Sequence, residues 1–165
     1  KKEHILKTKN LTNIKNEKRL LEKLDCPFII KLRYTFQNKE KIFMCLDYYN
    51  GGELFFHLQN NRGFSEDLVR FYAAEIYCAL SYLHENKIIY RDLKPENIIL
   101  DSDGHIKLID FGLAKDKIDD ANPTATVCGT NEYIPPEVIK GEPYAYNFDW
   151  WGFGILLYEM LYGKV

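Results

Sequence analysis

The sequence has little excess charge, no paired cysteine motif and no long hydrophobic run. Its 22 Lys and Arg residues against 24 Asp and Glu residues leave a formal net charge of −2. It therefore lacks the overall positive field that attracts nucleic acid or an anionic membrane. The four cysteines lie far apart and form neither a CxxC pair nor a Cys/His cluster, a pattern typical of a reducing compartment. We therefore expect a cytoplasmic protein without a nucleic-acid partner.

Segments for export or membrane insertion are also missing from the sequence. Residues 1–4 lack the apolar core of a signal peptide, and the longest apolar stretch, near the C-terminus, is too short to span a bilayer. The remaining composition, 165 residues of which 46% are hydrophobic, predicts one soluble globular domain with a sizeable core.

The apolar residues of segment 11–24 recur at helical spacing and predict an amphipathic helix. Glu17 lies three residues after Ile14 and four before Leu21, so it shares the apolar face. Two interpretations are open for it. A buried carboxylate would need a cationic partner, whereas a carboxylate at the margin of the stripe would reach water.

Two hairpins are predicted from strand and turn patterns. The first joins a half-buried strand at 28–36 to a strand at 42–48. Its first strand would place alternate residues on one side: Phe28, Ile30, Leu32, Tyr34 and Phe36. The second hairpin joins 98–100 to 106–109 across the turn-forming segment Asp101-Ser102-Asp103-Gly104.

Three further helices are predicted, two between the hairpins and one after the second hairpin. Glu53 opens a short helix, and Ser65 is the expected N-cap of a long helix that ends near His84. Residues 115–123 are polar and predict an irregular loop. In a last helix at 150–162, with Asp149 as its expected N-cap, ten of thirteen residues are apolar or aromatic. Such a helix should be buried on every side, so we expect an apolar patch wherever it is uncovered.

The charged heptad at 91–97 lies between two apolar runs, an arrangement that holds polar groups rigidly at a surface. The second hairpin would bring Asn97 and Asp110 to the same open end. Two hard oxygen donors facing one point suit Mg²⁺, which completes its coordination with water and phosphates. Asp92, in the same loop, is placed to accept a proton from an incoming hydroxyl.

Three segments resemble, in order and spacing, the signatures of protein kinases. They are Tyr90-Arg91-Asp92-Leu93-Lys94-Pro95-Glu96-Asn97, Asp110-Phe111-Gly112 and Pro135-Pro136-Glu137. Finer motifs, among them Gly51-Gly52-Glu53-Leu54-Phe55 and Thr126-Val127-Cys128-Gly129-Thr130, resemble the group of protein kinases A, G and C, and the loop length is most similar to protein kinase B and its relatives. The resemblance implies an incomplete two-lobed α+β fold from helix C to helix F, with 1–49 from the small lobe and 50–165 from the large lobe.

The same resemblance implies transfer of the ATP γ-phosphate to Ser or Thr with the help of Mg²⁺, Lys94 indicating serine/threonine specificity. Asp92 would be the catalytic base, Lys94 would steady the phosphoryl group, and Asn97 and Asp110 would hold metal. The residues implied at ATP are Glu17 through a lysine, Leu46 as gatekeeper, the backbone of Asp47 and Tyr49 at adenine, Glu53 at ribose, and Glu96 and Asn97. Those implied in the spine between the lobes are Leu21, Leu32, Tyr90 and Phe111.

Regulation and substrate choice are implied by resemblance too. Thr126 would carry an activating phosphate, added by an upstream kinase and paired with Arg91. Glu53, Glu96 and Glu159 would select a protein or peptide with basic residues upstream of the target, and Thr130 would contact the catalytic loop near Asp92 and Lys94.

The sequence departs from the family in lacking a GxGxxG loop and the strand with the ATP-binding lysine, and in carrying Asn131 and Pro135 where relatives often have Pro and Ala. We expect the 165 residues alone to have little or no activity. The competing hypothesis is a pseudokinase-like scaffold or allosteric partner. The retention of Asp92, Lys94, Asn97 and Asp110 favours catalysis. A different nucleotide-binding enzyme would need another phosphate-binding motif, and the sequence has none.

Overall fold

The computed structural model describes residues 1–8 and 11–164. Val165, the last residue of the predicted large-lobe part, lies outside them. The N-terminal elements are α1 (Lys2–Lys7), α2 (Leu11–Leu21), β1 (Leu32–Gln37) and β2 (Ile42–Leu46). The later elements are α3 (Leu54–Asn61), α4 (Glu66–Glu85), β3 (Ile88–Ile89), η1 (Pro95–Asn97), β4 (Ile98–Leu100), β5 (Ile106–Leu108), β6 (Lys115–Asp116), η2 (Asn131–Tyr133), α5 (Pro136–Ile139) and α6 (Asn147–Tyr162). This mixture confirms the predicted α+β class.

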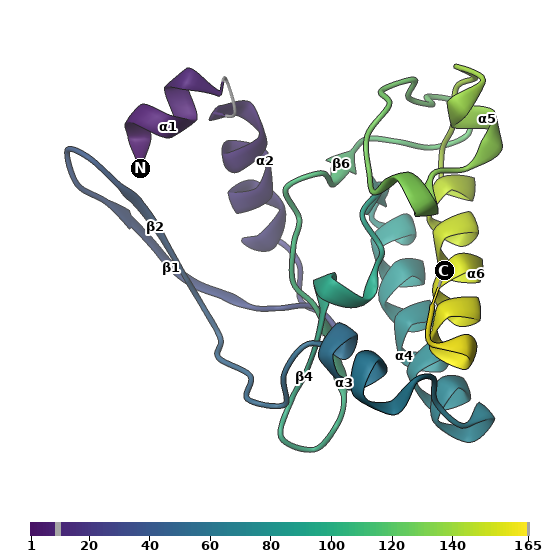
Figure 1. The fold of residues 1–165 in the computed structure, drawn as a ribbon. Helices are drawn as coiled ribbons and strands as arrows, with labels where there is room; N and C mark the ends of the chain where they lie inside the picture. The colour runs from purple at the N-terminus through teal and green to yellow at the C-terminus, as the bar shows by residue number, and fades with distance from the viewer. Residues whose placement is uncertain (9–10, 165) are drawn as a thin grey trace.

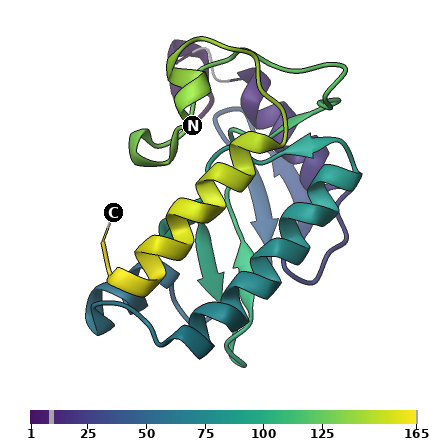
Figure 2. The same cartoon turned by 90° about the vertical axis from the view of Figure 1, so that its right-hand side faces the viewer.

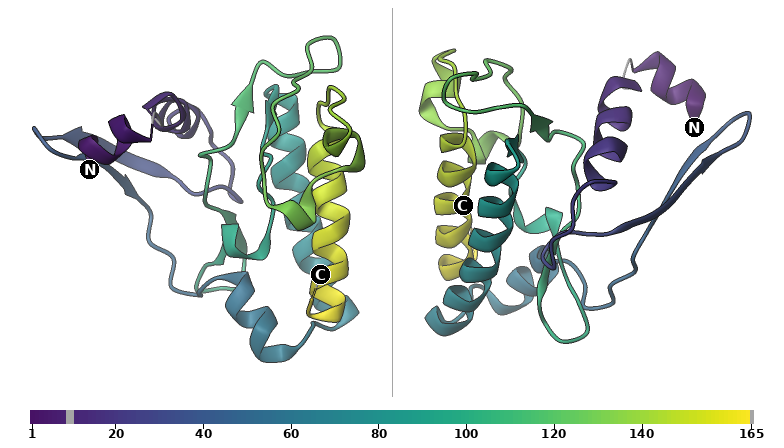
Figure 3. Two further views of the ribbon diagram at one scale, coloured as in Figure 1. Left: turned by 45° about the horizontal axis from the view of Figure 1, so that its top comes forward. Right: turned by 180° about the vertical axis from the view of Figure 1, so that it is seen from behind.

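The described chain has a thin N-terminal part and a thicker helical part. The first hairpin projects away from α3, α4 and α6, and α1 and α2 lie beside it (Figures 1 and 3). In the helical part, α4 and α6 run side by side in front of the short strands (Figure 2). One hydrophobic core joins the two parts, because Leu20 and Leu21 of α2 belong to the same cluster as residues of α4, the second hairpin and α6. This shared core fixes α2 relative to the segments that carry the polar site.

The first hairpin is confirmed, but the predicted side of its first strand is wrong beyond Leu32. Tyr34 is 73% exposed and Phe36 is 56% exposed. The antiparallel register pairs Leu32 with Leu46 and then Tyr34 with Cys45, which marks a bulge between Leu32 and Tyr34. One extra residue on a strand moves every following side chain to the opposite face.

The predicted strand start is wrong as well. Strand β1 begins at Leu32, whereas Ile29 forms an isolated parallel bridge with Leu108 of β5 and is buried. The backbone N–H of Ile30 donates to the carbonyl of Leu108 at 2.9 Å. The segment before β1 is thus held by the second hairpin, which connects the N-terminal part to the helical part.

The amphipathic helix is confirmed as α2, which ends three residues before the predicted limit. The long helix is confirmed as α4, with Ser65 as its N-cap accepting from the Leu68 N–H at 3.4 Å. Glu75 of α4 is buried and accepts hydrogen bonds from the Ile106 N–H at 3.0 Å and from His105. It therefore attaches the second hairpin to the helix.

The last helix is confirmed, but its predicted start and cap are wrong. Helix α6 begins at Asn147 with Tyr146 at the N-cap position, so Asp149 lies inside the helix. Asp149 instead accepts hydrogen bonds from the backbone N–H groups of Tyr90 and Arg91. Part of α6 is uncovered, and large apolar side chains are exposed there, as expected. These side chains are Trp151, Tyr158, Leu161 and Tyr162.

The second hairpin is confirmed with the register Ile98 to Leu108 and Leu100 to Ile106. The expected irregular loop at 115–123 needs one correction, because Lys115 and Asp116 form β6 and pair with β3. None of the helices in residues 1–8 and 11–164 is both long enough and apolar enough to cross a membrane.

Candidate active site

The charged heptad at 91–97, which is the predicted catalytic loop, is held at its start by one buried carboxylate of α6. Asp149 is 1% exposed, and its two oxygens accept the backbone N–H groups of Tyr90 at 2.9 Å and Arg91 at 2.8 Å. His84 of α4 contacts the same carboxylate through Nε2 at 2.8 Å and stacks on Tyr146. Arg91 has a φ of 70°, a conformation that costs free energy. The carboxylate therefore stabilises a strained turn directly before Asp92.

Asp92 lies at the centre of a hydrogen-bonded network. Thr130 donates to its Oδ1 at 2.9 Å, and the Asn97 Nδ2 donates to its Oδ2 at 2.8 Å. The Lys94 ammonium lies 3.1 Å from Oδ2 and also donates to Thr130 at 3.0 Å. The predicted contact of Thr130 with the catalytic loop is present. Three side chains from two distant segments thus fix the direction of one carboxylate.

The loop that carries Thr130 approaches the catalytic loop closely at Gly129. This glycine has a φ of 106°, and a Cβ atom there would lie 2.9 Å from the carbonyl oxygen of Arg91. A larger residue would clash with the backbone next to Asp92. Glycine is therefore required for the close approach that positions Thr130.

The structure brings together the two predicted metal ligands. Asn97 precedes β4, and its carbonyl accepts the N–H of Ile109, the residue before Asp110. The Asn97 amide nitrogen donates to both the backbone and the carboxylate of Asp92. Within residues 1–8 and 11–164, no hydrogen bond to its amide oxygen is found. Asp110 uses Oδ1 to accept the Gly112 N–H at 2.8 Å. The pair offers hard oxygen donors in the small number that Mg²⁺ uses when phosphates and water supply the rest.

Glu17 lies between the two alternatives that the sequence left open. Its side chain is partly buried, and burial together with the negative charge of Asp110 raises the pKa of its carboxyl. The negative charge of Asp110, a predicted metal ligand, thus acts on this carboxyl of α2. The four predicted spine residues share the core: Leu21, Tyr90 and Phe111 are buried in it, and Leu32 packs against it. Tyr90 and Phe111 meet edge to face with ring centroids 5.2 Å apart.

Four of the residues predicted at ATP lie at the end of β2 or on its connection to α3: Leu46, Asp47, Tyr49 and Glu53. Leu46 ends β2 and is 37% exposed. Asp47 forms a two-pronged ion pair with Arg33 at 2.6 and 2.8 Å, and the guanidinium lowers the pKa of the Asp47 carboxyl. The Asp47 N–H donates to the carbonyl of Lys31. Of its backbone groups, the carbonyl therefore remains for a ligand.

The predicted substrate glutamates do not all meet. Glu96 and Glu159 line one cavity of about 390 Å³, together with Glu132 and Tyr133. Glu53 is exposed at the N-cap of α3 and is not part of that lining. Burial raises the pKa of the Glu159 carboxyl, the Tyr133 hydroxyl that donates to it opposes the rise, and the charges of Glu96 and Glu132 add to it. Three glutamates and one lysine, Lys164, therefore line the cavity, so its net charge is negative.

The predicted phosphorylation site is exposed at the surface of the loop. Thr126 is exposed, and its carbonyl accepts from the Tyr144 hydroxyl. Arg91 is buried and donates to Tyr144 at 3.3 Å and to the carbonyl of Leu113 at 2.8 Å. Lys115 reaches the same loop by donating to Thr124. The cationic side chains of Arg91 and Lys115 thus donate to uncharged groups close to Thr126.

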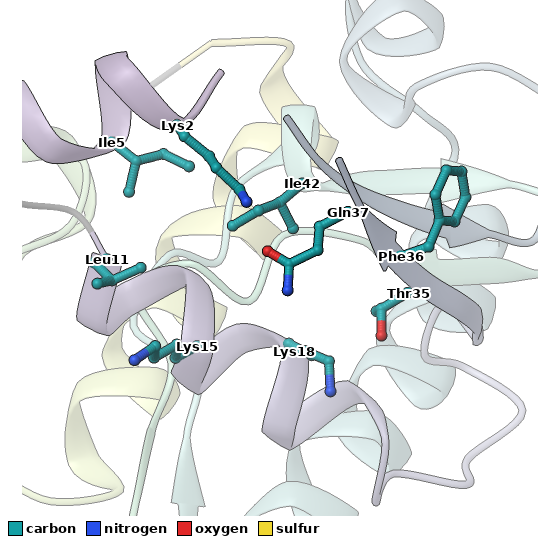
Figure 4. Close-up of a pocket in the computed structure, with 9 residues that line it drawn as sticks. All are labelled: Lys2, Ile5, Leu11, Lys15, Lys18, Thr35, Phe36, Gln37 and Ile42. Carbon is teal, nitrogen blue, oxygen red and sulfur yellow. The ribbon is translucent and has the colours of Figure 1, made fainter. Parts of the chain in front are cut away.

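A separate hollow of about 360 Å³ lies between α1, α2 and the first hairpin. Figure 4 shows Leu11, Ile5 and Ile42 around it, with lysines of α1 and α2 at its edge. The exposed ring of Phe36 stacks on Phe43 at a centroid distance of 4.7 Å. The sequence did not predict this hollow, because the bulge in β1 decides which strand residues face it.

Sequence reasoning also missed residues that support the site. Asp149 was interpreted as a helix cap, and a carboxylate within an apolar helix was the available signal that it has buried partners. Glu132 has no role in the sequence-based predictions, although it lies only two residues after Thr130, which does. His84 and Lys115 gave no signal beyond their charge.

Comparison with known proteins agrees with this geometry. Residues 1–165 match the protein kinase domain family. The serine/threonine-protein kinases Sgk2 and Sgk1 of Homo sapiens are each 54% identical over 163 residues, which cover 98% of this chain and 44% and 38% of those proteins. The serine/threonine-protein kinase sgk-1 of Caenorhabditis elegans is 52% identical over 98% of the chain and 35% of its own length. The chain thus spans less than half the length of these curated relatives. With the family match extending from end to end, the chain belongs to the protein kinase domain family.

Proposed function

We propose that this chain forms part of the catalytic domain of a serine/threonine protein kinase that uses ATP and Mg²⁺. The network around Asp92 carries the proposal. Its Oδ1 and Oδ2 are each fixed by a donor, Thr130 and Asn97. A carboxylate held in one direction accepts the proton of a substrate hydroxyl as that hydroxyl attacks phosphorus.

Lys94 supplies the second chemical element of this proposal. Its ammonium is held 3.0 Å from Thr130 and 3.1 Å from Asp92. A cation fixed beside the base stabilises the negative charge on the transferred phosphoryl oxygens without moving during the reaction. Bound Mg²⁺ would neutralise the phosphates of ATP, and Asn97 and Asp110 would hold it.

The proposed nucleotide contacts extend toward the first hairpin. We assign Glu17 to the pairing of an ATP-binding lysine, Leu46 to the gatekeeper position, and the backbones of Asp47 and Tyr49 to adenine. Glu53, exposed before α3, would contact ribose and a basic substrate residue. Residues 1–49 would then belong to the small lobe and residues 50–165 to the large lobe.

The acidic cavity supports a substrate with basic residues upstream of the target. Glu96 and Glu159 line it, and the Tyr133 hydroxyl orients Glu159. An arginine side chain entering the cavity would form charge-assisted hydrogen bonds with these carboxylates. Thr126 would carry the activating phosphate from an upstream kinase, because it is exposed near Arg91 and Lys115.

A cytoplasmic location is part of the same proposal. All four cysteines are free thiols, as expected in a reducing compartment.

The test of catalysis uses the natural protein that contains this sequence and its Asp92→Asn variant. We expect the variant to lose at least about 100-fold in phosphate transfer from radiolabelled ATP, because general-base removal alone costs this much. Asp120→Asn, at an exposed loop position, is the matched control and should keep full activity.

Equal transfer by the Asp92→Asn variant would overturn the role of Asp92. Nucleotide binding without transfer by the unaltered protein would favour the scaffold hypothesis instead.

A further inference from the structure

Helix α2 carries a partly buried carboxylate, Glu17. Burial and the negative charge of Asp110, which follows β5, raise the pKa of this carboxyl. Like charges at a partly desolvated site repel each other. Polar contacts that hold α2 in place, in addition to the core packing of Leu20 and Leu21, would offset this repulsion.

The residues on either side of Glu17 make such contacts. The Arg19 Nη1 donates to the Asp116 Oδ2 at 2.7 Å, and its Nη2 donates to the Asn16 Oδ1 at 2.5 Å. The Asn16 Nδ2 donates in turn to the carbonyl of Ala114 at 2.8 Å. Asn16 and Arg19 are three residues apart and thus lie on one face of the helix. We call Asn16, Arg19, Ala114 and Asp116 the α2 clamp.

The partners in this clamp belong to the segment directly after the metal-binding residue. The Ala114 N–H donates to the carbonyl of Phe111 at 3.1 Å, which closes a turn beside Asp110. Asp116 pairs with Ile88 in the two-stranded sheet of β3 and β6. Strand β3 leads into the catalytic loop, so the clamp connects α2 to both sides of the site.

Strand β6 presents its two side chains to different partners. Asp116 contacts Arg19, whereas Lys115 donates to the hydroxyl of Thr124 at 2.9 Å. Successive residues of a strand point to opposite faces. One face of β6 is thus occupied by α2 and the other by the loop that carries Thr126.

The apolar residues of α2 lie on other faces than Asn16 and Arg19. Leu20 and Leu21 are buried in the core, and Leu11, Lys15 and Lys18 line the hollow of Figure 4. The side chains of Arg19 and Asp116 are 41% and 23% exposed. Their charges can therefore be exchanged without opening the core.

We propose that the α2 clamp sets the position of α2, and with it that of Glu17, with Arg19 and Asp116 as positioning residues that hold the helix against the segment after Asp110-Phe111-Gly112. The inference deepens the proposed kinase function and rests on it for its kinetic consequence. Loss of the clamp lets α2 move away from the site. The Michaelis constant for ATP then rises, while Asp92 and its network stay intact.

The experiment is a charge exchange in the natural protein, with Arg19→Glu, Asp116→Arg and the double variant. Amide hydrogen exchange of residues 11–21 and the KM for ATP are measured in parallel. Each single variant should exchange about 3- to 10-fold faster in α2 and show a KM raised by a similar factor, as expected for a partly exposed ion pair within a network. The double variant should return both values to within about twofold.

Arg70→Glu is the matched control, because it reverses an arginine that pairs with two exposed carboxylates on α4. It should change neither measurement. Arg19→Gln is the milder variant and should give the same direction of change if Arg19→Glu fails to fold.

The clamp is refuted if the Arg19 variants leave exchange in α2 unchanged, or if the double variant is as impaired as the singles together. The proposed kinase function fails separately, when the unaltered protein transfers no phosphate. In that case hydrogen exchange alone still decides the clamp, because it needs no activity.

Discussion

Replacement of Asp149 by Ala tests how the catalytic loop is held. The side chain is buried within α6 and accepts the backbone N–H groups of Tyr90 and Arg91, together with Nε2 of His84. Alanine offers no acceptor. The variant therefore leaves two buried backbone donors without a partner at the point where Arg91 adopts a positive φ.

The size of the effect follows from these contacts. A buried donor left unsatisfied costs about 1–3 kcal/mol, so two such donors set the expected loss at about 2–6 kcal/mol. For a domain of about 150 to 250 residues, this corresponds to a fall in Tm of at least about 4 °C. Asp92 follows Arg91 directly, and a displaced catalytic group costs up to about 100-fold in turnover. We expect kcat to fall by about 10- to 100-fold.

Urea unfolding of the natural protein and phosphate transfer well below the Tm of the variant measure the two effects separately. Asp120→Ala, at an exposed loop position, is the control and should stay within about 0.5 kcal/mol of the unaltered protein. The reasoning is refuted if Asp149→Ala changes the free energy of unfolding by less than that amount. An unchanged kcat would show that the loop keeps its shape without the carboxylate.

Two further predictions concern the substrate and the loop. Because the pKa of the Glu159 carboxyl is raised, this side chain gains a proton at a higher pH than an ordinary glutamate as the solution is acidified, and its attraction for arginine is lost. The KM for a peptide with arginine upstream of the target should therefore rise on acidification. The Glu159→Gln variant should have a KM about tenfold higher than the unaltered protein at neutral pH, and its KM should depend less on pH. A peptide array without preference for upstream arginine would contradict this. Thr126 should carry a phosphate in the active protein, and intact-mass analysis that finds active enzyme with Thr126 unmodified would exclude the assignment.

The residues proposed to do chemistry could be singled out from the sequence because they lie in short, continuous motifs. Asp92, Lys94 and Asn97 lie within six residues, and the turn between β4 and β5 brings Asp110 to the same end of the hairpin as Asn97. Local turn chemistry therefore determines their relative positions. The long helix was predictable for the same reason, because Ser65 caps it locally.

Features that depend on distant partners were not predictable in this way. A bulge in β1 exposes Tyr34 and Phe36, although their spacing is that of a buried strand face. Strand β6 forms only because β3, far away in sequence, pairs with it. A polar two-residue segment has no strand signal of its own.

By itself, the sequence determined the α+β class, the order of four helices and two hairpins, and the motif residues expected to transfer phosphate; it did not predict α1 or α5. Those features depend on local spacing, capping and turns. Only the tertiary structure decided that Asp149 supports the catalytic loop, that Glu132 joins Glu96 and Glu159, and that Arg19 connects α2 to Asp116. Each of these contacts joins residues from separate segments, and the packing of α2, α4 and α6 around one shared core brings them together.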